Sequence, residues 1–261
     1  MPELPEVETI AQRLGTVLPQ KSLTSIIVLH PKSFIGEVEQ LSGLTVSRVL
    51  RKAKILQIYL SDNTYLLIHL KMTGQLIYID DKVKLGGGHP TADWTRDLPS
   101  NHTRVIVSFQ DGSNLYFNDQ RIFGWAKHVE GDALAHEFRN YGPDIVSPFV
   151  TPDYFFQKAQ RRSITIKQFL LDNSVAAGVG NIYACDALNL ARIHPTRSAL
   201  SLSKDEMERL LIATKAVIEL GIQHGGASID TYVTAEGLTG TYQNVRRVYA
   251  REGGSCPNCG E

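Results

Sequence analysis

The sequence predicts an α+β chain of several domains, in which a leading helix and a β-rich half precede a helical half. Short runs rich in Val, Ile, Leu and Tyr, separated by turn signals, continue as far as Glu130. From Pro152 to Gly221 the apolar residues instead recur with the period of a helix. The length of 261 residues is typical of one large domain or two ordinary ones.

The first segment is predicted to be an amphipathic helix. Its apolar side chains recur at helical spacing, at Val7, Ile10, Ala11 and Leu14. Pro5 suits the first turn of a helix, where its missing N–H is not needed. Glu3, Glu6 and Glu8 lie near the positive end of the helix dipole, where carboxylates are favourable.

Residues 22–130 are predicted to form a β-sandwich or a β-barrel. Strand-like runs lie at 44–60, 65–70 and 75–79, and turn signals such as Ser61-Asp62-Asn63 and Asp111-Gly112 separate such runs. Many short strands joined by hairpins are typical of sandwiches and barrels. Residues 85–101, with three successive glycines and two prolines, are expected to be a surface loop.

The second half is predicted to hold helices at residues 152–160, 164–173, 181–191 and 203–221. Ser203 and Glu206 have the spacing of a capping box at the start of the last helix. From Arg246 onward the pattern returns to β structure and turns. We therefore expect a β domain at 1–131, a turn-rich linker at 132–151, a helical domain at 152–245 and a terminal ribbon segment at 246–261.

Composition argues against a membrane-spanning, secreted or disulfide-rich protein. No apolar run is long enough to span a bilayer, and no basic stretch followed by an apolar one marks a secretory signal, so we expect the chain in the cytoplasm. Three cysteines, two of them in a C-x-x-C motif, do not make a disulfide framework. Lys and Arg together number 27, as do Asp and Glu, so any surface for a polyanion must be a local patch.

The first residues contain a candidate nucleophile. A small residue at position 2 favours removal of Met1, which would leave Pro2 with a free secondary amine beside the carboxylate of Glu3. An α-amino group has a pKa near ~8, so part of it is unprotonated at neutral pH. Such amines attack carbonyl carbons, and the iminium that a secondary amine forms stays cationic. The alternative is a plain helix start, which these residues alone favour.

Two further sets of residues suit contact with phosphate. Gly178, Gly180 and Asn181 lie between two predicted helices, with Asn181 expected at the N-cap of the second. Helix N-termini bind phosphate, although a simple helix connection has the same pattern. Lys52 and Lys54 are expected on the same side of a strand, either on a solvated face or as phosphate contacts.

Met72, Arg121 and Phe123 each follow a predicted strand and lie close to a glycine. On loop tips these side chains would form a wedge that enters a duplex and fills the space left by an extruded base. Taken singly, Met and Phe are more often core residues. Cys256 and Cys259 have the spacing of half a tetrahedral zinc site, which needs four ligands.

Taken together, these residues resemble bacterial formamidopyrimidine-DNA glycosylase. The segments that carry the resemblance are Met-Pro-Glu-Leu-Pro-Glu-Val-Glu-Thr at the start, Arg-Lys-Ala-Lys-Ile-Leu at 51–56, Ile-His-Leu-Lys-Met-Thr-Gly at 68–74, Asp-Gln-Arg-Ile-Phe-Gly at 119–124, Gly-Val-Gly-Asn-Ile-Tyr-Ala at 178–184 and Val-Tyr-Ala-Arg-Glu-Gly at 248–253. They occur in the family's order and span nearly the whole chain. Leu4 and the wedge set resemble this enzyme rather than its relative endonuclease VIII.

The resemblance implies an N-terminal β-sandwich, a helix–two-turns–helix element around Asn181 and a C-terminal zinc-ribbon hairpin. It also implies a base-excision repair enzyme, a bifunctional DNA glycosylase and abasic-site lyase that removes 8-oxoguanine and formamidopyrimidines from duplex DNA. In this scheme Pro2 forms a Schiff base at C1′, Glu3 is the acid and base, and strand cleavage follows by β- and then δ-elimination. Damaged double-stranded DNA is the implied partner of a monomer that needs no organic cofactor.

The resemblance also implies roles for the DNA-binding residues. Lys54 contacts the phosphate next to the lesion and assists the chemistry, and Asn181 is a phosphate ligand. His102, Arg121 and Arg162 match DNA-binding positions, and Arg121 is expected to pair with the orphaned cytosine. Met72, Arg121 and Phe123 match the wedge, and Tyr242 lies in the segment 241–244, where the family's loop covers the everted base.

The sequence departs from the family pattern at its end. The second cysteine pair is absent, and so is the arginine between the pairs, so the sequence is either a shortened version of a longer chain or has lost its finger. Zinc, expected from the family, therefore has only the half-site Cys256 and Cys259. A non-catalytic module that binds damaged DNA and an endonuclease VIII-like enzyme for oxidised pyrimidines stay as alternatives.

Overall fold

The computed structural model describes residues 1–89, 93, 96–227 and 240–260. Contacts divide the chain into two compact units, one of Met1–Arg139 with Gly225–Thr241 and one of Asn140–His224 with Tyr242–Glu261. The division after Arg139 falls inside the segment 132–151. The return of Gly225–Thr241 to the first unit depends on contacts distant in sequence, and no local pattern indicates it.

The leading helix, α1 (Leu4–Val17), forms as predicted. Glu3 is its N-cap, and Glu3 and Glu6 make a capping box that uses the free N–H groups of the first turn. The apolar stripe predicted from Val7 to Leu14 is buried. One face of α1 therefore packs in the core, which fixes the position of the residues just before it.

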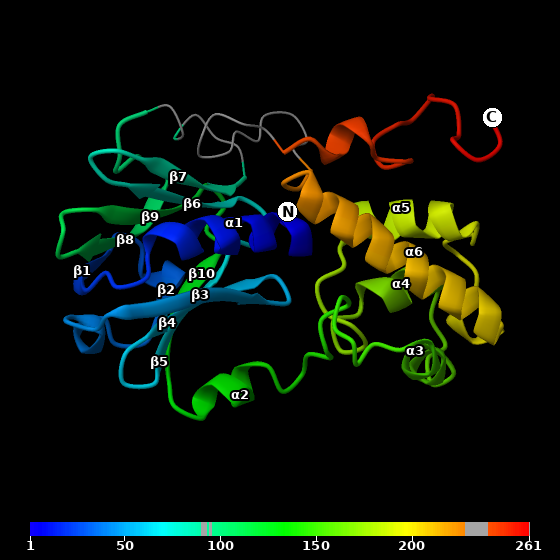
Figure 1. The fold of residues 1–261 in the computed structure, drawn as a ribbon, viewed down its shortest axis with the longest axis horizontal. Coiled ribbons are helices and arrows are strands. Elements are labelled where there is room, and N and C mark those ends of the chain that lie inside the picture. Colours follow the sequence, from blue (N-terminus) through cyan, green and yellow to red (C-terminus); the bar gives the residue numbers. More distant parts are fainter. Residues whose placement is uncertain (90–92, 94–95, 228–239, 261) are drawn as a thin grey trace. The chain divides into compact units, whose positions relative to one another are not determined.

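Two five-stranded sheets form a sandwich (Figure 1). The first sheet has the order β1 (Leu23–Val28), β8 (Thr103–Phe109), β9 (Asn114–Asp119), β6 (Gly74–Ile79) and β7 (Lys84–Gly88). The second has the order β2 (Phe34–Ile35), β10 (Trp125–Glu130), β5 (Thr64–His69), β4 (Ile55–Leu60) and β3 (Val46–Lys52). Neighbouring strands are antiparallel, except that β2 pairs with β10 in parallel. The short helix α2 (Ala133–Glu137) follows β10.

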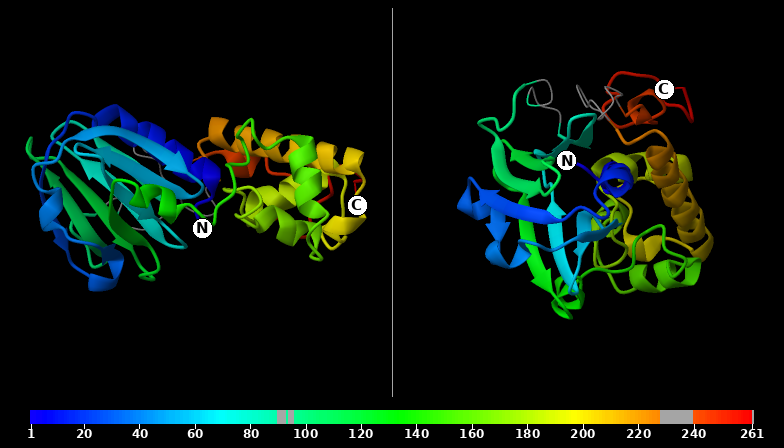
Figure 2. Two further views of the ribbon diagram at one scale, coloured as in Figure 1. Left: turned by 90° about the horizontal axis from the view of Figure 1, so that it is seen from below. Right: turned by 60° about the vertical axis from the view of Figure 1, so that its left-hand side comes forward.

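Apolar side chains of α1 and of both sheets share one core. α1 packs against β3 and β7, which are the last strands of their two sheets, and therefore lies along one side of the sandwich (Figures 1 and 2). The N-terminus of the chain is thus fixed to the sandwich through the whole length of a buried helix face.

The predicted surface loop at 85–101 is wrong at its start, because Lys84–Gly88 pairs with β6 as strand β7. Gly86 makes this pairing possible, since a Cβ there would lie 1.8 Å from the carbonyl oxygen of Leu76. Three successive glycines normally indicate a loop, but here they allow close contact between backbones.

The second unit contains the four predicted helices, α3 (Pro152–Ala159), α4 (Ile166–Leu171), α5 (Asn181–Ala191) and α6 (Lys204–Gln223) (Figure 2). The capping box of Ser203 and Glu206 is present at the start of α6. Gly221 lets α6 approach α5 closely, since a Cβ there would lie 2.5 Å from the Tyr183 ring. One detail of the prediction is wrong: Gly180 is the N-cap of α5, and Asn181 is its first helical residue.

The predicted return to β structure after Arg246 is also wrong. Residues 240–260 contain the short 3-10 turn η5 (Tyr242–Asn244) and further turns, and no strand. The buried carboxylate of Asp186 on α5 accepts hydrogen bonds from the N–H groups of Arg247, at 3.0 Å, and Val248, at 2.9 Å. A side chain thus satisfies backbone donors that a partner strand would otherwise bind. In the described part of the chain, no helix is long and apolar enough to cross a bilayer.

Candidate functional site

The start of α1 gathers the candidate nucleophile and two buried carboxylates. Pro2 is buried, and Glu3 is only 2% exposed. The Glu6 carboxylate accepts a hydrogen bond from the Glu3 N–H at 2.7 Å with Oε2 and another from the Ala227 N–H at 2.7 Å with Oε1. Glu6 therefore fixes the backbone beside Pro2 and joins it to the segment that returns from the end of α6.

Lys54 lies in the turn between β3 and β4, where Ala53 takes a left-handed conformation with φ of 56°. Arg51 holds this turn against α1, because its Nε lies 2.7 Å from Glu8 Oε2 and its Nη1 donates to the Ala53 carbonyl at 2.9 Å. The expected common side of Lys52 and Lys54 is wrong, since the strand and its alternation end at Lys52. Lys52 instead places its Nζ 4.7 Å from the centre of the Phe138 ring.

Lys54 is only 7% exposed, and burial lowers the pKa of its ammonium group. The charges of Glu3 and Glu6 oppose this and favour the protonated form. A lysine in such surroundings loses and regains its proton more readily than one in water, which suits a group that contacts an anion and moves a proton.

His69, at the end of β5, is a buried neutral imidazole beside this lysine. Burial, followed by the charges of Lys71 and Lys54, lowers the pKa of His69 to about 3. Its Nδ1 accepts a hydrogen bond from the Lys71 N–H at 3.0 Å, so the ring proton resides on Nε2. The sequence gave no sign that His69 is buried beside Lys54.

Replacing His69 with Asn is expected to reduce the loss of stability in acid. Between pH 6.5 and about 3 the unfolded imidazole binds a proton that the folded one does not, so stability falls as the pH drops through this window. At pH 4.5, two units below 6.5, this amounts to about 2–3 kcal/mol at ~1.4 kcal/mol per unit. Urea unfolding at pH 7 and pH 4.5 measures the difference. The same substitution at exposed His136 is the control, and an equal acid loss in wild type and His69→Asn contradicts this account.

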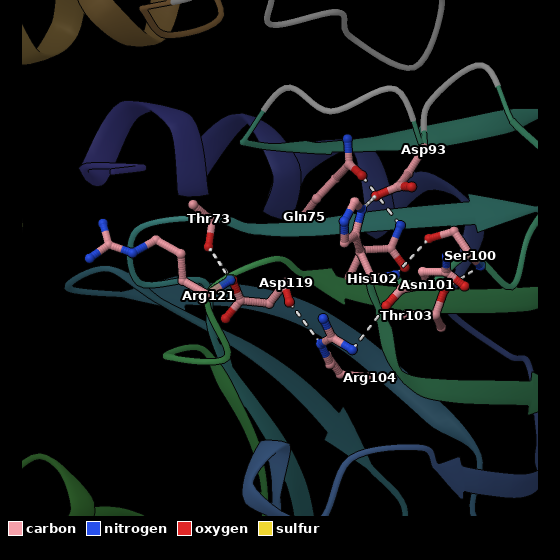
Figure 3. Close-up of polar contacts among 11 residues, drawn as sticks. Thr73, Gln75, Asp93, Ser100, Asn101, His102, Thr103, Arg104, Asp119 and Arg121 are labelled. Atoms are coloured by element: carbon pink, nitrogen blue, oxygen red, sulfur yellow. Dashed lines mark hydrogen bonds and ion pairs between the residues drawn. The ribbon is translucent and has the colours of Figure 1, made fainter.

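A second cluster surrounds the fully buried carboxylate of Asp119 at the end of β9 (Figure 3). Its Oδ2 accepts the N–H groups of Phe123 at 2.8 Å and Gly124 at 2.6 Å. Its Oδ1 accepts the Arg121 N–H at 3.2 Å and the hydroxyl of Thr73. One side chain thus shapes the loop after β9 and joins it to the loop after β5.

These two loops carry the predicted wedge. Met72 is 39% exposed and Phe123 is 53% exposed, so neither is a core residue. Arg121 is also exposed, and its guanidinium lies 4.7 Å from the centre of the Phe123 ring. Ile122 between them has φ of 57°, a left-handed conformation that a branched side chain adopts only under constraint. The bonds to Asp119 provide that constraint.

His102 lies at the start of β8, close to the Asp119 cluster (Figure 3). Its ring Nδ1 is 2.8 Å from Oδ2 of Asp93, and its carbonyl accepts the Asp119 N–H at 2.8 Å. Arg104 donates from Nε to the Asp119 carbonyl at 2.7 Å. The backbone that carries His102 is therefore fixed to the end of β9.

The remaining predicted DNA contacts lie in the second unit. Asn181 is exposed at the first position of α5, at the positive end of the helix dipole. Arg162 pairs with Asp172 at 3.2 Å and donates to the Ser174 hydroxyl at 2.8 Å. Tyr242 is only 1% exposed, and its hydroxyl donates to Asp186 at 2.8 Å, so its side chain packs inside this unit. Its role in covering a base stays a prediction, and the residues 228–239 just before this segment lie outside the described part of the chain.

The cysteine pair does not form a complete zinc site. Cys256 and Cys259 supply two of the four ligands that a structural zinc ion needs, and among the described residues no three His, Cys, Asp or Glu side chains are arranged to hold a metal ion. The backbone N–H groups of Asn258 and Cys259 help to lower the pKa of the Cys256 thiol to about 7. No chemical step is therefore assigned to zinc.

The sequence analysis did not identify two carboxylates that shape the backbone of the candidate site, those of Glu6 and Asp119. Glu6 lies in the first turn of the predicted helix, but its contact with Ala227 joins positions 221 residues apart. Asp119 lies at the end of a strand-like run, where a carboxylate indicates only a turn.

Two family models match the chain. Residues 1–126 match the formamidopyrimidine-DNA glycosylase N-terminal domain, and residues 141–233 match the formamidopyrimidine-DNA glycosylase H2TH domain. Among curated relatives, formamidopyrimidine-DNA glycosylase of Pelotomaculum thermopropionicum is 36% identical over 268 residues, which cover 100% of this chain and 92% of the relative. That of Desulforamulus reducens is 37% identical over 270 residues, with the same coverage.

Solved structures agree with these relatives. The MutM (Fpg) protein of Thermus thermophilus superposes with a TM-score of 0.86 at 33% identity, covering 100% of this chain and 91% of that chain. The Lactococcus lactis Fpg in complex with DNA that contains an abasic site gives a TM-score of 0.86 at 28% identity, covering 99% of this chain and 92% of that chain.

Proposed function

The chain belongs to the formamidopyrimidine-DNA glycosylase family, and from this we infer that it is a DNA glycosylase of base-excision repair that removes oxidised purines from duplex DNA. The Lactococcus lactis member of the family binds abasic-site DNA and DNA with a formamidopyrimidine lesion, Fapy-dG. The observation that carries the inference is the joint burial of Pro2, Glu3 and Lys54 in a unit that also exposes Met72, Arg121 and Phe123.

We propose that Pro2 is the nucleophile of the glycosylase step once Met1 is removed. With Met1 attached, the Pro2 nitrogen belongs to a peptide bond and has no lone pair to donate. The free secondary amine attacks C1′, and the bond from C1′ to the base breaks. The base leaves with that electron pair and takes up a proton. The attached nitrogen then loses its proton, and the C1′–O4′ bond breaks as O4′ takes up a proton, which opens the sugar ring and leaves an iminium on Pro2.

Glu3 is the proposed acid and base of this step. Its position at the N-cap of α1 holds the carboxyl group next to Pro2, and Glu6 fixes its backbone N–H. Lys54, which shares the electrostatic field of these carboxylates, is the proposed contact for the phosphate beside the lesion. The ammonium charge would balance the phosphate while Glu3 exchanges its proton.

The abasic-site lyase step is also a proposal. The iminium on C1′ acidifies the C2′ proton, and when a base removes it the C3′–O bond breaks and the phosphate on the 3′ side leaves with the electron pair. A second proton loss, at C4′, allows the phosphate on the 5′ side to leave by δ-elimination. Water then hydrolyses the iminium and frees Pro2. This sequence needs no reactant other than water and the protein's own bases.

We propose that Met72, Arg121 and Phe123 enter the duplex where the damaged nucleotide leaves it. Removing a base from the stack costs a few kcal/mol, and inserted side chains recover part of that free energy. Since the substrate is DNA and the curated relatives are bacterial, we place the enzyme's action on the chromosome of a bacterial cell.

Release of damaged bases separates this function from its alternatives. The Met1-free chain is expected to release 8-oxoguanine opposite cytosine at least about tenfold faster than thymine glycol, since pocket contacts discriminate by about that factor or more. Undamaged duplex is the control. Faster release of thymine glycol would favour the endonuclease VIII-like alternative, and binding of damaged duplex without release of either base would favour a non-catalytic module.

A further inference from the structure

His102 and Asp93 form a pair in which the imidazole is partly exposed and the carboxylate is buried. Asp93 Oδ2 lies 2.8 Å from His102 Nδ1, and the Asp93 side chain is 1% exposed while that of His102 is 32% exposed. A buried carboxylate is costly unless a donor partners it. The imidazole is therefore the member of the pair that is accessible to solvent.

The ring is fixed in orientation as well as in place. An ionised carboxylate accepts hydrogen bonds only, so the proton in this contact resides on His102 Nδ1. The His102 N–H donates to Ser100 Oγ at 3.1 Å, and its carbonyl accepts the Asp119 N–H at 2.8 Å. With the backbone and Nδ1 held, Nε2 on the other side of the ring is the nitrogen left to meet a ligand.

We propose that Asp93 is a positioning residue that holds the His102 imidazole so that its Nε2 donates a hydrogen bond to a phosphate of the DNA backbone. This proposal rests on the function proposed above. Asp93 holds the ring at Nδ1, so Nε2 on the opposite side faces away from the carboxylate and is placed to meet a phosphate oxygen. Enzymes commonly use a carboxylate to orient an imidazole through one ring nitrogen while the other nitrogen binds a ligand or transfers a proton.

Replacing Asp93 is expected to change DNA affinity in the direction opposite to that of most acidic surface residues. Removing a negative charge from a DNA-binding surface normally strengthens binding to DNA. Loss of Asp93 is expected to weaken it instead, because the charge acts through His102. Exposed Asp97 lies four residues further along the sequence, and its charge acts on Lys84, so Asp97→Asn removes an equal charge without altering a carboxylate that holds His102 and is the matched control.

The test is a double-mutant cycle on binding to a duplex with a tetrahydrofuran abasic analogue, followed by fluorescence anisotropy across a range of salt concentrations. His102→Gln is expected to weaken binding about tenfold and to reduce the salt slope by about one. Asp93→Ala is expected to weaken binding severalfold with a similar drop in slope, and Asp93→Asn less, since its amide oxygen still accepts from Nδ1. In the His102→Gln background, Asp93→Ala is expected to add nothing.

Unchanged or tighter binding by Asp93→Ala would overturn the proposal, and so would an equal loss in the His102→Gln background. If Asp93→Ala fails to fold, Asp93→Asn carries the same comparison. The ¹⁵N signals of the His102 ring report the pairing without DNA, and they are expected to change when Asp93 is replaced but not when Asp97 is. A wild-type chain that does not prefer the abasic duplex would overturn the proposed function even if the ring signals still show the pair.

Discussion

Glu3→Gln is expected to slow release of 8-oxoguanine by about 10²–10⁴-fold while the chain stays folded, since that is the usual contribution of a positioned acid or base. Gln keeps the size of the side chain and an amide oxygen for the helix cap, but it carries no acidic proton. Glu3 is almost fully buried next to Pro2, so water does not readily replace it. Single-turnover release from a duplex with 8-oxoguanine opposite cytosine measures the change.

The same variant offers an internal check. At a preformed abasic site the base is already gone, so covalent trapping by Glu3→Gln is expected to persist. The exposed Glu39→Gln is the control and should release the base at the wild-type rate. Wild-type release by Glu3→Gln would contradict the role of Glu3. Loss of trapping on the abasic duplex as well would show that Glu3 supports the amine rather than the departing base.

Asp119→Asn is expected to lower the free energy of unfolding by about 2–4 kcal/mol, because several buried hydrogen bonds to a charged acceptor are lost or weakened. An amide has one acceptor oxygen, so it can serve the Phe123 and Gly124 N–H groups or the Thr73 and Arg121 side, but not both. The loop that presents Phe123 and Arg121 then loses its fixed shape. We expect the variant to lose most of its preference for abasic over undamaged duplex.

Hydrogen exchange makes this test specific. The amides of Phe123 and Gly124 are expected to lose protection in Asp119→Asn, while amides in the core of the β-sandwich keep theirs once global stability is taken into account. Asp62→Asn, at an exposed turn with φ of 58°, is the control and should change neither stability nor binding. Unaltered protection of Phe123 and Gly124 would contradict the role of Asp119.

Local patterns predicted most of the elements in this chain. The period of Val7, Ile10 and Leu14 gave α1, and Ser203 with Glu206 gave the start of α6. Within each of these two patterns the residues lie only a few positions apart, so helix geometry alone relates them. The candidate nucleophile Pro2 and the exposed wedge residues also followed from the sequence, with the family resemblance, because their motifs are local.

Three of the errors share a physical cause, since each depends on a contact that is distant in sequence. Lys84–Gly88 is a strand because Gly86 fits against Leu76. The turn at Ala53 that separates Lys52 from Lys54 is held by the contact of Arg51 with Glu8. Residues 247–249 bond to Asp186 instead of to a strand. Nothing within either partner's own segment indicates these contacts.

The burial of Glu6 shows the same limit within the site. Its position in the first turn of the predicted helix indicates only a favourable interaction with the helix dipole. The structure adds the Ala227 N–H, and Gly226, with φ of 88°, leaves room for Glu6 only because it lacks a Cβ. The sequence alone does not indicate that Gly226 lies beside the Glu6 carboxylate. In the structure it lets the returning segment approach the N-terminus of α1.

Borohydride trapping on an abasic duplex, followed by mass spectrometry of the cross-linked peptide, tests whether the Pro2 amine is the nucleophile. The Met1-free chain is expected to form a reduced adduct whose only modified residue is Pro2, because its amine is the proposed nucleophile. A chain with an N-terminal extension, in which Pro2 is part of a peptide bond, is expected to form none. A cross-link at Lys54, or no cross-link from the Met1-free chain, would contradict the account.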